Sequence, residues 1–218
     1  MSNADSRVSV RPATAPDAAD IAAIQVASLR SVARAVGGAS VDVSPLEVQR
    51  AWNDTLSRIP PPGCSTMVAL HGTRVVGFVV AQPAPSHHID HAKAPDIPDG
   101  LELAALDVDE RFRRSGHASR MLAAIVDTAR EAGLSARSLQ VWISPNDEAR
   151  VRFFQSAGFA PAGLLRRLDV AGTPMTQHLW WAGLDSAGSG GGGRPNAQAD
   201  SAGARGPEGC GHPAESTN

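Results

Sequence analysis

The chain has 218 residues, of which 42% are hydrophobic and 19% are charged, and its formal net charge is -2. This length and composition predict one domain built around one core. The nearly neutral charge balance argues against a general attraction to nucleic acid or to acidic membranes, so neither is expected as a partner.

The two ends of the chain differ from its centre in composition. Residues 1–6 are polar and lack the apolar segment of a signal peptide, and no apolar run approaches the length of a membrane span. Residues 185–218 contain no bulky apolar side chain whose burial could offset the entropy cost of ordering. We therefore expect a cytoplasmic protein with a flexible N-terminus (1–6), one folded domain (7–184) and a disordered Gly/Ala/Ser-rich tail (185–218).

Strands and helices are predicted to alternate through the domain. Thr14 and Ser44 are each followed three residues later by an acid, which indicates two helix N-termini. The first half is expected to hold a strand at 8–11, helices at 14–36 and 44–59, and a hairpin at 66–70 and 74–80. After a long loop at 82–99, the second half is expected to hold strand 101–108, helix 116–132, strand 138–143, helix 148–157 and a hairpin at 164–170 and 175–181. This order predicts an α/β fold with a mixed sheet and helices on both faces.

The most informative segment joins a strand to a helix in the middle of the chain. The apolar strand ends at Val108, a polar turn rich in arginine follows, and Gly116 and Ala118 open an amphipathic helix. Small residues at a helix start let an anion approach the backbone, where unpaired N–H groups and the helix dipole favour it. Arg113 and Arg114 can add charge-assisted contacts. The segment therefore predicts a site for a diphosphate.

This segment resembles the diphosphate motif of the GCN5-related N-acetyltransferases, the GNAT superfamily. The motif is Gln or Arg, two residues, Gly, one residue, then Gly or Ala, and it matches the chain from Arg113 to Ala118. The strand end Leu106-Asp107-Val108 and the following Met121-Leu122 match as well. The opening at 10–18 and the segment from Asn146 to Phe159 also resemble the family, so the resemblance spans roughly residues 7–184.

The resemblance implies a mostly antiparallel central sheet and a direct transfer without a covalent acyl-enzyme. An acyl group, most often acetyl, passes from acetyl-CoA as co-substrate to a primary amine. The diphosphate is expected to contact, mostly through backbone, Arg113, Arg114, Ser115, Gly116, His117, Ala118 and Ser119. The side chain of His117 is expected to point outward. Backbone N–H groups among Leu106, Asp107 and Val108 are expected to stabilise the developing oxyanion.

Glu102 is the candidate general base. It lies on the strand that ends at Val108, and some members of the family have a carboxylate at this position. Partial burial would raise the pKa of such a carboxylate toward the useful range. An equally strong alternative is an alternating strand that turns Glu102 to solvent.

Phe154 departs from the family, in which many members have a Tyr that protonates the leaving thiolate. The chain contains no Tyr. The role of the acid could fall to Ser144, Asn146, Ser156 or water, or could be unnecessary. Asn146 is placed among the residues that bind the cofactor, although capping of the following helix is the simpler explanation of its position.

Three further points remain open from the sequence. The missing Tyr favours a non-catalytic, CoA-binding regulatory or sensor module of the same fold. The cluster His87, His88, Asp90 and His91 could suggest zinc, but its crowded spacing is more typical of a polar loop, so no metal is expected. Edge strands near Trp180 could pair between two subunits and form a homodimer.

Overall fold

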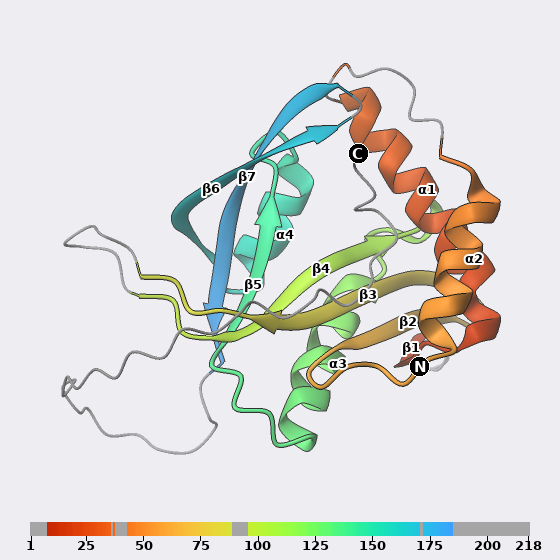
Figure 1. Ribbon diagram of the computed structural model, residues 1–218, viewed down its shortest axis with the longest axis horizontal. Helices are drawn as coiled ribbons and strands as arrows, with labels where there is room; N and C mark the ends of the chain where they lie inside the picture. The colour runs from red at the N-terminus through yellow and green to blue at the C-terminus, as the bar shows by residue number, and fades with distance from the viewer. Residues whose placement is uncertain (1–7, 36, 38–42, 89–95, 171, 185–218) are drawn as a thin grey trace, which may run out of the picture.

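The computed structural model describes residues 8–35, 37, 43–88, 96–170 and 172–184 (Figure 1). The predicted flexible N-terminus, the predicted tail, Asp90 and His91 lie outside the described residues. The elements are, in chain order, β1 (Val8–Pro12), η2 (Ala15–Asp17), α1 (Ala18–Ala35), α2 (Pro45–Leu56), β2 (Ser65–His71), β3 (Arg74–Ala84), β4 (Gly100–Val108), η3 (Glu110–Phe112), α3 (His117–Glu131), β5 (Ser138–Ile143), α4 (Glu148–Ser156), β6 (Ala160–Val170) and β7 (Thr173–Gly183). Both the order and the type of the predicted elements are confirmed.

A seven-stranded sheet in the order β1-β2-β3-β4-β5-β7-β6 forms the centre of the molecule. Neighbouring strands are antiparallel except for β4 and β5, which are parallel. This confirms the mixed, mostly antiparallel α/β sheet. Among the described residues, β4 and β5 pair only where 100–102 lie beside 138–140. Beyond that point the two strands diverge (Figure 1), which opens the middle of the sheet.

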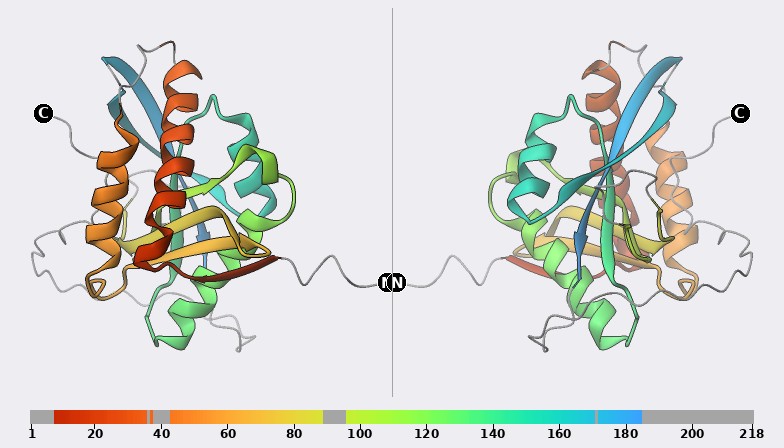
Figure 2. Two further views of the ribbon diagram at one scale, coloured as in Figure 1. Left: turned by 90° about the vertical axis from the view of Figure 1, so that its right-hand side faces the viewer. Right: turned by 90° about the vertical axis from the view of Figure 1, so that its left-hand side faces the viewer.

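Helices cover both faces of the sheet and bury a hydrophobic cluster on each face, and a third, smaller cluster is formed by Ile97, Ala162 and Leu179. Helices α1 and α2 lie on one side, and α3 and α4 lie on the other (Figure 2). On the first side, Trp52 of α2 packs edge-on against Phe78 of β3, with ring centroids 5.6 Å apart. On the second side, Met121 and Ile125 of α3 pack with strand residues and with Phe154 of α4. The two faces of the sheet are therefore buried by different helix pairs.

The predicted helix starts are formed by the expected residues. The amide N–H of Thr14 donates to Asp17 Oδ2 at 2.8 Å, and Arg11 holds the same carboxylate through both of its terminal nitrogens, at 2.7 and 2.8 Å. Hydrogen bonding to Arg11 is the main cause that lowers the pKa of Asp17. At α2 the direction is reversed, because the hydroxyl oxygen of Ser44 accepts from the amide N–H of Glu47 at 3.5 Å. The first turn after Thr14 is a 3-10 turn, η2, before α1 proper begins.

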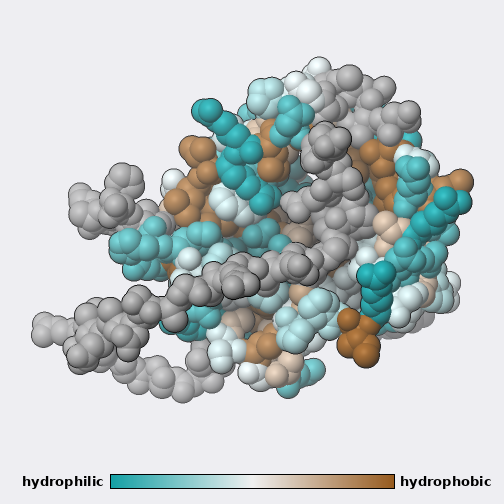
Figure 3. All heavy atoms as spheres, in the orientation of Figure 1, coloured by the Kyte–Doolittle hydropathy of each residue, from teal (hydrophilic) through white to brown (hydrophobic). Residues whose placement is uncertain are grey.

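The described surface is mixed in polarity. On the face drawn in Figure 3, hydrophobic residues form separate spots among hydrophilic ones. The most exposed large apolar side chains, Leu46, Ile59 and Leu165, belong to three different parts of the fold. In the part of the chain that is described, no helix is both long and apolar enough to cross a membrane.

Candidate functional site

The turn before α3 adopts an unusual backbone conformation. Gly116 is the N-cap of the helix with φ +77°, in the left-handed region, and Arg114 also has a positive φ of 64°. A non-glycine residue in this region is strained, and such strain gathers at functional sites. The first amide bonded within the helix is that of Arg120, which donates to Gly116 O at 3.1 Å. The amides of His117, Ala118 and Ser119 therefore have no acceptor inside the helix.

These amides open onto a cavity of about 360 Å³, here called the turn cavity. It lies where β4 leaves β5, between the start of α3 and the first turns of α4. Its walls are formed by Leu106, Asp107, Val108, Phe112, Arg113, Arg114, Gly116, His117, Ala118, Ser119, Asp147, Ala149, Arg150, Phe153 and Phe154. The structure thus brings the predicted turn and the predicted strand end into one cavity, with Ser115 beside it in sequence.

At the end of β4, the backbone C=O and N–H groups of every second residue point toward this cavity. The carbonyls of Leu106 and Val108 accept from Arg150 Nη2 at 2.9 Å and from Arg113 Nε at 3.4 Å, so both face away from β3. The carbonyl of Asp107 faces β3, where a Cβ built on Gly77 would lie 2.8 Å from its oxygen. In a strand, the N–H of a residue points to the same side as its C=O. The amides of Leu106 and Val108, but not that of Asp107, therefore face the cavity.

Positive charge gathers at the mouth of the turn cavity. Arg113 and Arg114 are both exposed and both line it. The nearby carboxylate of Asp109 is bound by the side chain of Arg111, with Nη2 at 2.6 Å and Nε at 3.0 Å. This bond is the main cause that lowers the pKa of Asp109. Because Asp109 is already paired with Arg111, it does not neutralise Arg113 and Arg114, which place positive charge at the mouth for an anionic ligand.

The expectation that His117 points outward is wrong. Its side chain is 1% exposed, and neither ring nitrogen has a hydrogen-bond partner among the described residues. The ring packs against Phe112 and His71, with centroids 6.4 and 5.9 Å away. Desolvation by burial, followed by the charges of His71 and Arg120, lowers the pKa of His117. Its four-residue spacing from Met121 and Ile125, both buried, is the sequence signal that indicates this inward face.

The comparisons with known proteins agree with this geometry. The family model described as the Acetyltransferase (GNAT) family matches residues 29–159. The chain belongs to the GNAT acetyltransferase family. No curated protein sequence matches the chain.

Solved structures of GNAT proteins share the fold. A ribosomal-protein-alanine N-acetyltransferase from Brucella melitensis superposes with a TM-score of 0.58 at 20% identity, over 81% of this chain and 99% of the other. A candidate acetyltransferase from Salmonella typhimurium, solved with its cofactor acetyl-CoA, gives 0.57 at 17% identity, over 87% and 99%. A GNAT acetyltransferase from Streptococcus pneumoniae gives 0.53 at 18% identity, over 82% and 99%.

Two candidate residues of this GNAT domain lie outside the turn cavity. Glu102 occupies the last pair between β4 and β5, opposite Gln140, where the sheet begins to open. Its neighbours Leu101 and Leu103 are buried on the α3 side, so the alternation of the strand turns Glu102 to the α1–α2 side. Asn146 is exposed and does not line the cavity.

Capping of α4 by Asn146 is also wrong, because Asp147 is the N-cap. Asp147 Oδ1 accepts from the amide of Arg150 at 3.0 Å. A carboxylate at the N-cap suits the positive end of the helix dipole, which is the sequence signal that favours Asp147 at this position.

The side chains considered as a general acid, Ser144, Asn146 and Ser156, do not line the turn cavity. Phe154 is fully buried and forms part of the cavity wall, but it offers no hydroxyl. The hydroxyl of Ser156 donates to Phe153 O at 2.7 Å, within its own helix. Neither Ser144 nor Ser156 lines the turn cavity. Within the described residues, the α4 wall of the cavity therefore carries no neutral proton donor.

The described histidines of the loop, His87 and His88, form contacts with neighbouring side chains. His87 Nε2 lies 3.1 Å from Gln140 Oε1, and His88 Nδ1 lies 2.8 Å from Asp96 Oδ1. Among the described residues, no group of three or more His, Cys, Asp or Glu side chains could hold a metal ion. The contact of His87 with Gln140 joins the loop to the sheet.

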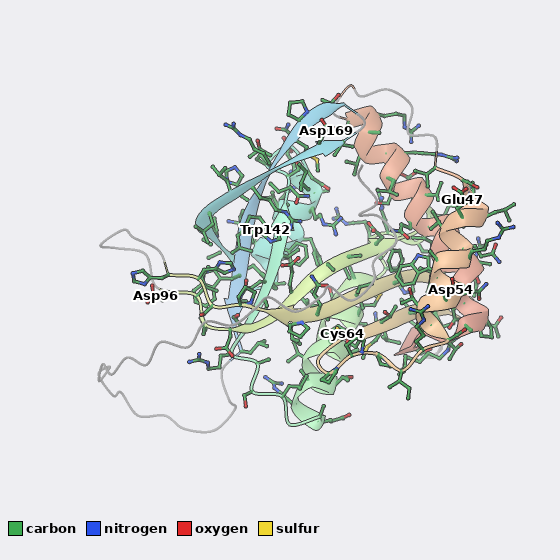
Figure 4. The ribbon with its side chains drawn as sticks, viewed as in Figure 1. Glu47, Asp54, Cys64, Asp96, Trp142 and Asp169 are labelled. Carbon is green, nitrogen blue, oxygen red and sulfur yellow. The ribbon has the colours of Figure 1, made fainter. Side chains whose placement is uncertain are left out.

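The fold brings two arginines to the opened sheet, and Arg150 was not among the residues predicted from the sequence. Arg150 of α4 reaches Leu106 and Asp107 on β4. Arg166 of β6 lies over the ring of Trp142, 4.7 Å from its centroid. Trp142 lies on β5 beside the β6–β7 hairpin (Figure 4). For Arg150 the available signal was its four-residue spacing from the apolar Phe154, which indicates a shared helix face.

Proposed function

We propose that the chain is an acyl-CoA-dependent N-acyltransferase that transfers acetyl from acetyl-CoA to a primary amine by direct attack in a ternary complex. The observation that carries this proposal is the turn cavity. It joins unpaired helix amides, two exposed arginines and the cavity-facing backbone of β4 in one continuous space. A diphosphate fits the first two features, and an amide-bearing arm can pair with the third as an added strand does.

Each part of the cavity has a separate role in this proposal. The amides of 117–119, with Arg113 and Arg114, hold the diphosphate. The Leu106 amide faces the cavity and is placed to donate to the thioester oxygen as negative charge develops there. The bond to Arg150 fixes the peptide orientation around Leu106, so this donor is oriented before the reaction.

Glu102 is proposed as the base that removes a proton from the attacking ammonium. Two facts support this role. Glu102 lies where the sheet opens, and the alternation of β4 turns it to the face opposite α3. An amine that enters from the α1–α2 side would thus meet the base on one face while the donor lies along the other. A cytoplasmic location stays a prediction from the sequence.

The decisive experiment is thermal unfolding with and without acetyl-CoA, in the parent and in Gly116→Glu. A ligand that binds the folded state raises the midpoint by mass action, by several degrees when its concentration is about 100 times Kd. We expect a rise in the parent and none in Gly116→Glu. The matched control is Gly133→Glu, because Gly133 also has a positive φ and its Cβ would meet open space beyond the other end of α3. This control should keep the rise.

The outcomes separate the proposal from its alternative. No rise in the parent at saturating acetyl-CoA would contradict acyl-CoA dependence altogether. A rise without consumption of acetyl-CoA across a panel of amines would favour the non-catalytic CoA-binding sensor. Release of free thiol that depends on an added amine supports transfer, and loss of that release in Glu102→Gln, with binding retained, supports the role of Glu102 as the base.

A further inference from the structure

The side chain of Arg150 crosses from α4 to β4 inside the turn cavity. Its Nη2 donates to the carbonyl oxygen of Leu106 at 2.9 Å, and its Nη1 lies 3.5 Å from Oδ1 of Asp107. The hydroxyl of Ser28 on α1 donates to that same Oδ1 at 2.9 Å. The side chain is 28% exposed and lines the cavity. The guanidinium is therefore a positive group held in place by a set of contacts that involves three elements.

The guanidinium lies beside the atoms that the proposed reaction would involve. The Leu106 amide faces the same side as the Leu106 carbonyl, which Arg150 already contacts. A thioester oxygen bound at that amide therefore places the adjoining sulfur close to the same guanidinium. Arginine carries five N–H donors, and the contacts with Leu106 and Asp107 engage two of its nitrogens. Donors remain for a further acceptor in the cavity.

The other side chains at this end of the cavity cannot stabilise a departing thiolate. Leu106, Ala149, Phe153 and Phe154 are apolar, and Asp107 is an acceptor that would repel negative charge. Arg150 and Phe154 are four residues apart on one helix, so they share the face that looks into the cavity. Arg150 is thus the cationic donor on this wall.

We propose that Arg150 is a catalytic residue that stabilises the thiolate of coenzyme A as it leaves. The inference rests on the proposed acyltransferase function. Asp107 is a positioning residue because its carboxylate lies against the guanidinium, and Ser28 is one because its hydroxyl holds that carboxylate. The group acts as a fixed charge and hydrogen-bond donor rather than as an acid, because arginine is not deprotonated in proteins.

The transfer step balances with Arg150 in this role. The amine lone pair forms the new C–N bond, and the carbonyl electron pair moves to oxygen and then returns. The C–S bond breaks, and its electron pair goes to sulfur, beside the guanidinium. The base takes one proton from the ammonium before the attack and passes it to solvent, and it takes a second proton from the same nitrogen after the C–N bond has formed. The guanidinium keeps all of its protons. The released thiolate takes up one proton from solvent, so that the reaction releases one proton overall.

The test measures the pKa of the coenzyme A thiol in the binary complex, which needs no knowledge of the amine. Thiolate absorbance is followed against pH for free coenzyme A and for coenzyme A bound to saturation. A cation within a few ångströms lowers a thiol pKa, so we expect the bound thiol to titrate about 1 pH unit or more below the free thiol. Calorimetry in two buffers of different ionisation enthalpy should show matching proton release on binding.

Three variants make the test specific to Arg150. Arg150→Met should return the bound thiol to the pKa of free coenzyme A. Arg150→Lys keeps the charge and should retain part of the shift. Arg152→Met is the matched control, because Arg152 lies on the same helix but is exposed and pairs with Glu148 at 3.3 Å; it should behave as the parent does.

The outcomes separate this inference from the proposed function. Coenzyme A that binds the parent with an unchanged thiol pKa would overturn the role of Arg150 while leaving the acyltransferase proposal intact. The role of Arg150 is overturned in the same way if Arg150→Met binds coenzyme A and keeps the lowered thiol pKa. Failure of coenzyme A to bind the parent would contradict the proposed function itself, and the inference with it.

Discussion

The two ends of β4 are held against their neighbours by different means. At its start, β4 pairs with β5 through backbone, and the small residues Gly100 and Ser138 lie side by side. At its end, β4 meets no strand on that side within the described residues, and long charged side chains take over: Arg150 at Leu106 and Arg113 at Val108. We call these regions the closed end and the open end. Backbone pairing leaves no room between the two strands, whereas side-chain contacts at the open end leave space beside β4 for a ligand.

A buried polar network secures the closed end. Gln140 is fully buried, and its Nε2 lies within 3.3 Å of three oxygens, those of the Pro85 and Pro98 carbonyls and the Ser138 hydroxyl. Its Oε1 lies 3.1 Å from His87 Nε2. A satisfied network of this kind fixes a unique arrangement, because every alternative leaves a buried polar group unpaired. The position where the sheet opens is therefore set at the closed end.

The largest expected effect is that of Gly100→Ala. A Cβ at Gly100 would overlap the backbone oxygen of Ser138, which cannot rotate away as a side chain can. We expect a loss of about 3 kcal/mol in the free energy of unfolding, measured by urea titration. Gly133→Ala serves as the control, since its Cβ would meet open space and the cost is limited to the strain of a positive φ. Equal losses in the two variants would contradict a tightly packed closed end.

Gln140→Leu should cost about 2 kcal/mol in the free energy of unfolding. The substitution keeps the volume but leaves the Pro85 carbonyl and the His87 ring without this partner, while the Pro98 carbonyl still accepts from the Ser138 hydroxyl at 2.6 Å. A double-mutant cycle with Ser138→Ala should show non-additive losses, because the two side chains share a hydrogen bond at 3.0 Å. Strictly additive losses would show that the network is not cooperative.

A pH effect is expected at the open end, from His117. Burial lowers the pKa of His117 below 6.5. Between that lowered pKa and about 6.5, His117 is therefore more often protonated in the unfolded chain than in the folded chain. The free energy of unfolding should therefore fall as pH drops below about 6.5 toward the lowered pKa. The pKa values of Asp17, Asp99 and Asp109 are lowered from 3.8, so their contributions are lost only at more acidic pH.

Thermal unfolding from pH 7.0 to 5.0 measures this effect. His117→Phe keeps an aromatic ring against Phe112 and His71 but removes the titrating group, so its midpoint should fall less steeply over that range. An unchanged slope in the variant would assign the pH effect to another group. Because His117 supports the first turn of α3, affinity for acetyl-CoA should fall with the midpoint in the parent.

The smallest expected effect is that of Ser28→Ala. It removes the hydroxyl that donates to Asp107 Oδ1 from α1, and Arg150 still contacts the same carboxylate. We expect a loss of about 0.5–1 kcal/mol in the free energy of unfolding. If the loss matched that of Gln140→Leu, the contrast between a closed end held by a buried network and an open end held by partly exposed side chains would not hold.

Local patterns predicted much of the fold. Capping residues, alternation and glycine stops located each of the described β-strands and α-helices but not the 3-10 turn η3, and β5 was placed from Ser138 to Ile143 as observed. Elsewhere boundaries moved, as in β3, which continues to Ala84 through an expected loop. The strand ends were missed because their pairing partners, such as Gly100 beside Ala84, come from distant parts of the sequence.

The candidate site likewise has features that the local sequence predicted and features that depend on the tertiary structure. The sequence by itself determined the turn from Arg113 to Ala118, because a strand end, a small residue and a helix start are consecutive and need no distant partner. Only the tertiary structure decided that His117 is buried and that Arg150 reaches Leu106, 44 residues away. Such contacts depend on which strands neighbour each other and where they separate. These are set by the whole sheet, so no local pattern contains them.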